Sequence, residues 1–244
     1  AAGAPAAARG RGRAGWGAVA LGWRLAALAA INAALLVSLT RSAWVGLALA
    51  LGLAIVLRSP RALLLVPPAA VVFVLLAPVP MLHRVASITD LSDTSNYDRL
   101  CMAEAGVRMI VERPLTGIGP EMVEHRYPIY RHPTAPRYWV PHLHNSFLQL
   151  AAERGLPALA AYLALLAASL AAAWSGYRRE GGRRGPRADL WLGALLAVVG
   201  FSFAGLFEHN WGDTEVQRLV LFLLAVPFCL RAGAPSPPPP RPTA

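Results

Sequence analysis

The sequence predicts an all-α integral membrane protein with about six transmembrane helices and a large, partly helical loop on the outer side. Of its 244 residues, 56% are hydrophobic and 15% are charged. This composition is too apolar for an ordinary soluble domain or a disordered chain. All 23 basic residues are arginines, and they alternate with long apolar runs, which excludes a soluble nucleic-acid binder. Two cysteines exclude a disulfide framework and a four-cysteine metal site.

Six apolar runs account for the expected spans. A helix needs about 20 mostly apolar residues to cross about 30 Å of hydrocarbon. The second run is short, the third has two prolines near its start, and the last is expected to begin near Thr214. The expected spans are 16–39, 43–57, 62–80, 156–174, 190–207 and 219–230.

Charge sets the expected orientation. Four connecting segments together carry twelve arginines and two acids, whereas the remaining connections carry ten arginines and eleven acids. The basic segments are expected inside, because cytoplasmic loops are enriched in arginine; a soluble helical bundle with basic loops is the alternative. The expected organisation is a basic cytoplasmic linker (1–15), three spans (16–80), an outer loop carrying the active site (81–155), three spans (156–231) and a Pro-rich disordered cytoplasmic tail (232–244).

The outer loop is expected to contain a helix. Ser95 and Asp98 form a capping-box pattern, so a helix is predicted to begin there and to end near Glu112, before Pro114. Its predicted apolar stripe is Leu100, Ala103, Val107, Ile110 and Val111.

That stripe separates the two arginines of the predicted helix. At 100° per residue, Arg99 and Arg108 lie on opposite sides of the stripe, about half a turn apart. We therefore expect Arg99 to face inward and Arg108 to face elsewhere. The alternative is that both are solvated surface charges.

Glycines and aromatic residues follow this helix. Gly117-Ile118-Gly119 allows a tight turn, and loop geometry explains it as well as phosphate binding does. Tyr130 belongs to a group of aromatic side chains that either stack on sugars or anchor the loop at the membrane interface.

His142-Leu143-His144-Asn145 is the sharpest polar cluster. A histidine at the mouth of a membrane helix is suited to general-base catalysis, because its pKa is ordinarily about 6.5. Asn145 would orient that histidine or a hydroxyl substrate. A metal site would need further ligands from His125, His132 or His209, and no spacing resembles a zinc motif, so no metal is expected. Alternatively, the histidine merely caps a helix.

Arg41 lies in the short turn between the first two expected spans. An arginine near membrane depth is costly and usually has a partner or a role. Its guanidinium group is suited to bidentate binding of phosphate. The alternative is an arginine that only extends toward the interface.

The order of these features resembles the O-antigen ligase and O-antigen polymerase family of membrane glycosyltransferases. Thr40-Arg41-Ser42-Ala43-Trp44 is similar to the family's turn between two spans. The stretch from Arg99 to Gly119 is similar to the start of its large periplasmic loop, and His144-Asn145 through Gly155 to the end of that loop. Ala158 departs from the pattern of ligases, which weakens the assignment to a ligase over a polymerase or a related transferase. The resemblance covers about 40–175, and we expect a C-terminal portion of a longer protein.

The resemblance implies a mechanism. A glycan on undecaprenyl diphosphate would be transferred to an acceptor hydroxyl at the outer face of the bacterial inner membrane. Arg41 and Arg99 would bind the diphosphate, and His144 would activate the acceptor, with inversion at the anomeric carbon. His142, Asn145, Arg108 and Tyr130 would contact substrate. No metal or other cofactor is implied; the partners are the lipid-linked donor, a lipid, glycan or protein acceptor, and membrane lipids.

Three other functions remain open from the sequence. A protein O-oligosaccharyltransferase of the same fold would differ only in its acceptor. A lipid-linked sugar transporter would place charged groups within its spans, whereas here only Arg24 and Asn32 lie well inside one. A non-catalytic scaffold would tolerate loss of His144 and Arg41.

Overall fold

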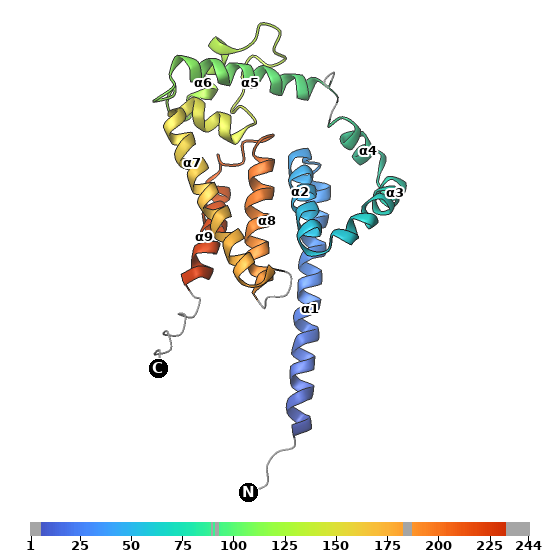
Figure 1. The fold of residues 1–244 in the computed structure, drawn as a ribbon. Coiled ribbons are helices and arrows are strands. Elements are labelled where there is room, and N and C mark those ends of the chain that lie inside the picture. Colours follow the sequence, from blue (N-terminus) through green and yellow to red (C-terminus); the bar gives the residue numbers. More distant parts are fainter. Residues whose placement is uncertain (1–5, 89, 91–92, 183–186, 233–244) are drawn as a thin grey trace, which may run out of the picture. The chain divides into compact units, whose positions relative to one another are not determined.

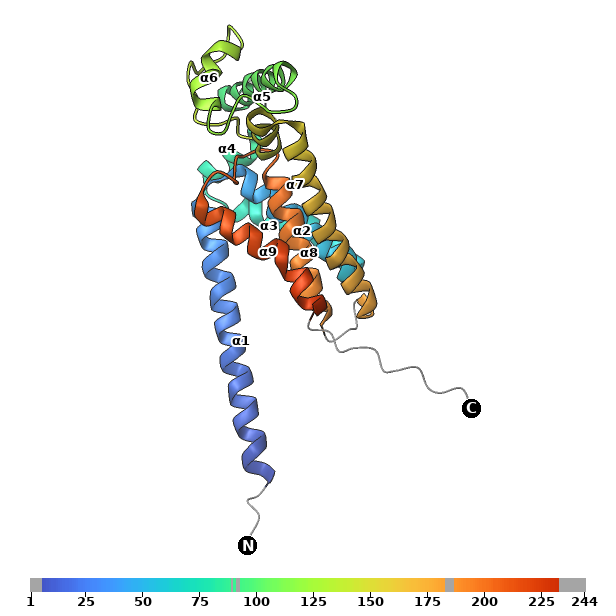
Figure 2. The same ribbon diagram turned by 90° about the vertical axis from the view of Figure 1, so that its left-hand side faces the viewer.

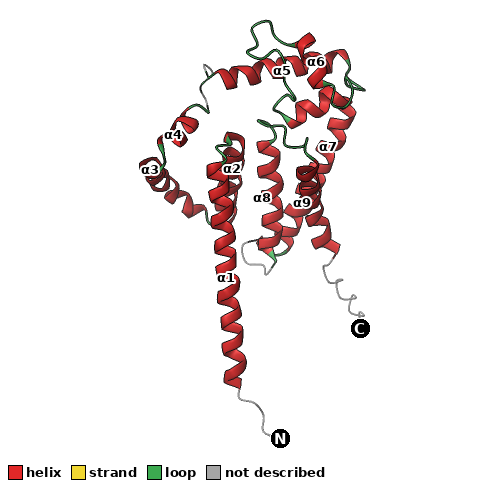
Figure 3. Ribbon diagram, turned by 180° about the vertical axis from the view of Figure 1, so that it is seen from behind, coloured by secondary structure: helices red, strands yellow, loops and turns green. Residues whose placement is uncertain are grey.

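The computed structural model describes residues 6–88, 90, 93–182 and 187–232. Its regular secondary structure is entirely helical in these ranges (Figure 3), which confirms the all-α class predicted from the sequence. Residues 1–5 of the expected linker (1–15) and residues 233–244 of the expected tail (232–244) lie outside the described residues, whereas residues 6–15 of the linker are helical. The chain divides into two compact units, residues 1–40 and 41–244.

The first unit is one long helix, α1 (Ala6–Val37), which contains most of the first expected span. Its apolar side chains are exposed: Trp23 is 74% and Ile31 65% accessible. Besides Arg24, Asn32 is the polar residue well inside this run, and it donates its amide to the carbonyl of Leu28 one turn earlier. An exposed apolar helix in which an amide side chain bonds to the helix's own backbone is suited to a lipid environment.

The second unit contains the remaining helices (Figure 1). They are α2 (Arg41–Arg58), the 3-10 helix η1 (Pro60–Leu65), α3 (Val66–Leu76), α4 (Val79–Ala86), α5 (Thr94–Glu112), α6 (Val123–Tyr130), α7 (Ser146–Arg179), α8 (Ala188–Ala204) and α9 (Thr214–Ala232). The start of α9 at Thr214 confirms the earlier beginning predicted for the last apolar run.

Four helices form what we call the bundle: α2, α8, α9 and residues 156–179 of α7. Within it α8 packs against the other three, and Figures 1 and 2 show α7 and α8 side by side. Small residues permit this packing. A Cβ atom added to Gly46 would lie 2.6 Å from the carbonyl oxygen of Gly200, so α2 and α8 touch through their backbones. The Ser169 hydroxyl donates to the carbonyl of Leu224 and joins α7 to α9.

Two helices, α2 and α7, are long and apolar enough to cross a membrane. Three further apolar helical stretches are shorter: Gly22–Val37, Pro60–Leu76 and Ala188–Ala204. The third expected span, 62–80, is not one continuous helix. It begins as η1, continues as α3 with Pro67 and Pro68 in its first turn, and ends before Pro78. Proline is accommodated in a first turn because the N–H that it lacks would have no helical partner there.

The two ends of the bundle differ in chemistry. At one end Arg58 pairs with Asp189, and the Tyr177 hydroxyl donates to the carbonyl of Leu57. Arg41 begins α2 at the other end. Ser146, the first residue of α7, lies at this same end, where its N–H donates to the carbonyl of Gly205 and its hydroxyl to the carbonyl of Glu208.

Residues 93–154, here called the loop region, have a core of their own. Met102 and Met109 of α5, Tyr127 of α6, Leu143 and Ala152 are fully buried together. The loop region meets the bundle at Gly155, whose φ of 82° interrupts α7 between two helical pieces. Figure 1 shows α5 crossing near the end of α7 rather than continuing the direction of the bundle helices.

Candidate active site

Arg41 is held in place at the first position of α2. Its side chain is buried, and Nη1 donates to the carbonyl oxygen of Ser87 at 3.1 Å and to the Ser87 hydroxyl at 3.0 Å. Nη2 lies 3.6 Å from a carboxylate oxygen of Asp93. These contacts fix the guanidinium group, which disfavours an arginine that merely extends into solvent.

The start of α5 differs from the capping box predicted at Ser95 and Asp98. Asp93 is the N-cap, and its carboxylate accepts from the backbone N–H groups of Ser95 and Asn96. Asp98 is buried and pairs instead with Arg137 at 3.0 Å. The prediction misplaced the cap by two residues, because Asp93 is equally suited to the position. The predicted end at Glu112, before Pro114, is confirmed.

The predicted apolar stripe of α5 is not its buried face. Leu100, Val107 and Val111 are more than half exposed, and Ala103 and Ile110 are only half-buried. The helix buries smaller and sulfur-containing side chains instead, and Gly106 fits against Leu148 of α7. The buried residues are Asp98, Cys101, Met102, Ala105, Gly106 and Met109. The prediction was wrong because the face that packs inside is less hydrophobic than the face that stays exposed.

Arg41 and Arg99 line one cavity of about 250 Å³. Asn96 adds a polar group, and Val45, Ile88, Leu100 and Phe207 supply apolar walls. Burial lowers the pKa of Arg99 below its usual range; the charge of Glu208 opposes this shift and that of Arg41 adds to it. Two neighbouring guanidinium groups with partly apolar surroundings form a site suited to an amphiphilic anion.

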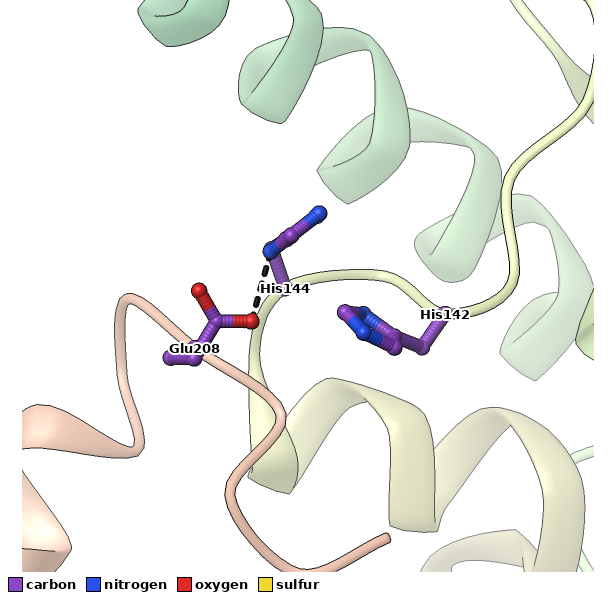
Figure 4. A group of neighbouring side chains, drawn as sticks. All are labelled: His142, His144 and Glu208. Carbon is purple, nitrogen blue, oxygen red and sulfur yellow. Dashed lines mark hydrogen bonds and ion pairs between the residues drawn. The ribbon is translucent and has the colours of Figure 1, made fainter. Parts of the chain in front are cut away.

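Glu208 connects this cavity to His144 (Figure 4). One carboxylate oxygen accepts a hydrogen bond from Nδ1 of His144 at 2.6 Å, and the other lies 3.8 Å from Nη2 of Arg99. Burial raises the pKa of Glu208, but the hydrogen bond and charge of His144, with the N–H of His209, outweigh it, so the pKa lies below its ordinary value. Glu208 is therefore an anion at neutral pH. With Nδ1 donating, Nε2 of His144 is left as the proton acceptor.

The segment between α8 and α9 is tied to the start of α7, and this brings Glu208 to His144. Asn145 donates its amide to the carbonyl of Leu206, and Ser146 bonds to Asn210 and to the carbonyl of Glu208. The amide oxygen of Asn145 also accepts from two backbone N–H groups as the N-cap of α7. Asn145, rather than a histidine, is thus the cap, and both ends of its amide are engaged.

A buried polar chain holds the backbone before His144. Gln149 accepts from the N–H of Leu143 at 2.9 Å and donates to Glu153 at 2.8 Å. Glu153 is buried, which raises the pKa of its carboxyl group. His144 itself has a φ of 48°, which a non-glycine residue adopts at a cost. The surrounding contacts therefore enforce the position of the imidazole.

The Gly117-Ile118-Gly119 turn packs against the part of α7 that precedes Gly155. The N–H groups of Ile118 and Gly119 donate to the carbonyls of Ala152 and Glu153. A Cβ atom on Gly117 would lie 2.4 Å from the carbonyl oxygen of Glu153. Loop geometry therefore explains this turn, since two of its N–H groups are already used within the protein.

His142 and His209 complete the surroundings of His144. The ring centre of His142 lies 4.4 Å from that of His144 and 5.4 Å from that of His209. Burial is the main cause that lowers the pKa of His142, and it lowers the pKa of His209 to about 4. Both rings are therefore neutral at pH 7.

A model of the O-antigen ligase family matches residues 25–163, more than half of the chain. The chain belongs to the O-antigen ligase family. No curated relative matches it. Members of the O-antigen ligase family are glycosyltransferase-type membrane enzymes of bacterial polysaccharide biosynthesis, located in the inner membrane. The matched residues include Arg41, Arg99 and His144, whereas Glu208 lies beyond them.

Two of the predicted substrate contacts lie elsewhere in this O-antigen ligase family member. Arg108 pairs with Glu104 and donates to the carbonyl of Tyr130, and the Tyr130 hydroxyl donates to Glu112 at 2.6 Å. The exposed Arg108 and the half-buried Tyr130 thus lie together, and neither lines the cavity of Arg41 and Arg99. Sequence reasoning did not identify Glu208, although it is one of two acids, with Asp213, in the short polar segment between two apolar helices.

Proposed function

We propose that the chain transfers a glycan from undecaprenyl diphosphate to an acceptor hydroxyl at the outer face of the inner membrane. The observation that carries the proposal is that Arg41 and Arg99 line one cavity, and that Glu208 contacts both Arg99 and His144. An apolar-walled anion site beside a positioned base is what this reaction requires, because the donor is a diphosphate on a long isoprenoid.

The reaction is a single displacement. Nε2 of His144 takes the proton of the acceptor hydroxyl while its oxygen attacks the anomeric carbon. The bond from that carbon to the diphosphate oxygen breaks, and undecaprenyl diphosphate leaves with the electron pair. Arg41 and Arg99 stabilise the charge that develops on it. Attack opposite the leaving group inverts the anomeric configuration, and Glu208 stabilises the imidazolium that forms.

We propose that this chemistry needs no metal ion. Arg41 and Arg99 supply the positive charge that a divalent cation supplies in other glycosyltransferases. The sequence also lacks an Asp-x-Asp pair. Addition of a chelator is expected to leave transfer unchanged, and loss of transfer that Mg²⁺ or Mn²⁺ restores would contradict this part of the proposal.

The proposed topology has six spans, with the segments 1–15, 58–61, 175–189 and 231–244 in the cytoplasm and 81–155 in the periplasm. It is supported by the bundle, in which Arg58 and Asp189 lie at one end and Arg41 and Ser146 at the other. With Cys229 replaced by Ser, a membrane-impermeant maleimide is expected to label Tyr138→Cys in intact spheroplasts and to spare Glu180→Cys until lysis. The reverse pattern would invert the topology.

Transfer by the purified protein in vesicles with a lipid-linked glycan tests the proposal. His144→Ala, Arg41→Ala and Arg99→Ala are each expected to abolish transfer and to leave insertion intact. Arg113→Ala is the matched control, since Arg113 is exposed and pairs only with its neighbour Glu112. Full activity in a site variant would refute the role of that residue. Supplying lipid A core, glycan or protein in turn identifies the acceptor.

The donor and the acceptor are proposed to contact different groups of residues. We assign His142, which adjoins His144, and the neighbouring Arg108 and Tyr130 to the acceptor, since the donor is proposed to occupy the cavity of Arg41 and Arg99. Asn145 positions His144 and Glu208 through its backbone contacts.

A further inference from the structure

His142, His144 and Glu208 come together from two segments separated by more than sixty residues (Figure 4). Each offers one nitrogen or oxygen ligand atom, and these three atoms all lie within 4.8 Å of one another. Two imidazoles and one carboxylate are a donor set that Zn²⁺ accepts, with a fourth position left open.

A second observation points to a ligand at this place. The Nδ1 atoms of His142 and His209 are buried and have no hydrogen-bond partner within the described part of the chain. Buried ring nitrogens are ordinarily paired, because an unpaired buried polar atom costs free energy. The two rings are neighbours, so both atoms belong to the environment of the same cluster.

We propose that His142, His144 and Glu208 bind a transition-metal ion, with Zn²⁺ the favoured one, and that the bound ion blocks glycan transfer. The inference rests on the proposed function of His144 as the base. A cation bound to Nδ1 of His144 displaces the proton that Nδ1 donates to Glu208, and the neutral imidazole then carries this proton on Nε2. Nε2 can therefore no longer accept the proton of the acceptor hydroxyl. The imidazole is then a metal ligand, and the interaction that orients it for catalysis is lost.

The donor set also predicts which metal binds. Imidazole nitrogen favours Zn²⁺, Co²⁺ or Cu²⁺, whereas Mg²⁺ and Ca²⁺ favour sites composed of oxygen. Only one of the three proposed ligands is an oxygen donor. Zn²⁺ is therefore expected to inhibit transfer at concentrations at which Mg²⁺ has no effect.

Co²⁺ titration of the purified protein, prepared without a polyhistidine tag, tests binding directly. One Co²⁺ per chain is expected to give visible absorption that Zn²⁺ removes. His142→Ala and Glu208→Gln are each expected to weaken binding by at least about tenfold. His125→Ala is the control, because His125 is exposed and lies outside the cluster. Thermal unfolding of each variant confirms that it is folded.

The absence of a Co²⁺ spectrum, or equal affinity in the control and both cluster variants, would overturn the metal site. Transfer that proceeds normally with Zn²⁺ bound would overturn the inhibition. These outcomes leave the proposed function intact, because they do not concern the metal-free enzyme. Conversely, full transfer by His144→Ala would refute the proposed function, while the Co²⁺ titration would still decide whether the ion binds.

Discussion

In the loop region, buried polar groups link segments that are distant in sequence, whereas in the bundle the helices meet through glycines and apolar side chains. Glu153 is buried and accepts from the N–H of Val123, and Asp98 is paired with Arg137. Away from Arg41 and Ser42 at its end, the bundle has instead the backbone contact of Gly46 and Gly200 and the buried Ser169. Packing of small residues is sufficient where helices lie in lipid. Directional bonds are needed where a base and two cations must be held at set positions.

Apart from the loss of Arg41, Arg99 or His144 itself, the largest effect is expected at Glu208, which joins these two regions. Glu208→Ala is expected to lower kcat by about 10²–10⁴-fold, because His144 loses the partner that orients it. The KM for the donor should change less. Glu208→Gln retains the shape but not the charge and should recover only part of the rate.

Steady-state kinetics of both variants provide the measurement, and Glu124→Gln is the control on the loop region. A Glu208→Ala variant with the kcat of the unmodified protein would show that the imidazole needs no carboxylate partner.

The next largest effect is expected at Gly155, where the loop region meets the bundle. Gly155→Ala is expected to destabilise the loop region by about 3 kcal/mol or more, since a Cβ atom there would lie 2.2 Å from the carbonyl oxygen of Leu115. Hydrogen exchange should show protection lost in residues 93–154 and retained in α8 and α9. Gly193→Ala, in α8 and with open space around it, is the control. Uniform loss of protection would mean that the two regions unfold as one.

A substitution at Gly46 tests the close contact of α2 with α8 in the bundle. Gly46→Val is expected to cost about 1–3 kcal/mol through forced separation of α2 and α8. Thermal unfolding in detergent measures the loss, and Gly52→Val, at an open position of the same helix, controls for the lower helix propensity of valine. Equal destabilisation by both substitutions would argue against a close helix contact.

Titration of Glu153 makes the stability of the loop region depend on pH. Its folded pKa is raised by burial, so the stability that the protonated form contributes is fully present below the unfolded pKa and is lost as pH rises through the folded value. Glu153→Gln should therefore flatten the stability of the loop region as pH rises above about 4.3, the ordinary pKa of a glutamate, with a change under about 1 kcal/mol at low pH. A steeper dependence in the variant would reverse the assigned sign.

The smallest effect is expected at Arg108. Arg108→Ala should raise KM for the acceptor a few-fold and leave kcat nearly unchanged, because the residue is exposed and its ion pair with Glu104 contributes under about 1 kcal/mol. Arg99→Ala, by contrast, should abolish transfer. Equal losses from the two variants would place both arginines at one site.

The sequence predicted the features that depend on local chemistry. Pro114 ends α5, and Thr214 begins α9, as expected from proline geometry and from the polar segment before an apolar run. The placement of Arg99 and Arg108 on opposite sides of α5 was predicted from helix periodicity alone. Family membership followed from ordered motifs around Arg41 and His144.

The features that were missed depend on contacts between distant residues. The stripe of Leu100, Val107 and Val111 was expected to be buried, but hydrophobicity does not indicate burial in a chain whose exposed surfaces are apolar. Glu208 lies 64 residues from His144, and only the bonds of Asn145 and Ser146 bring them together. No local pattern encodes such a pairing.

The contact of Gly46 with Gly200 lies five residues along α2 from Arg41, a distance of about 7.5 Å in a helix. Any side chain that separates these two backbones also displaces the guanidinium group a little more than one turn away. Positions that contact only lipid and protein can therefore alter how tightly the cavity of Arg41 and Arg99 would hold the proposed diphosphate donor. A substitution at such a position would change donor binding without touching the donor.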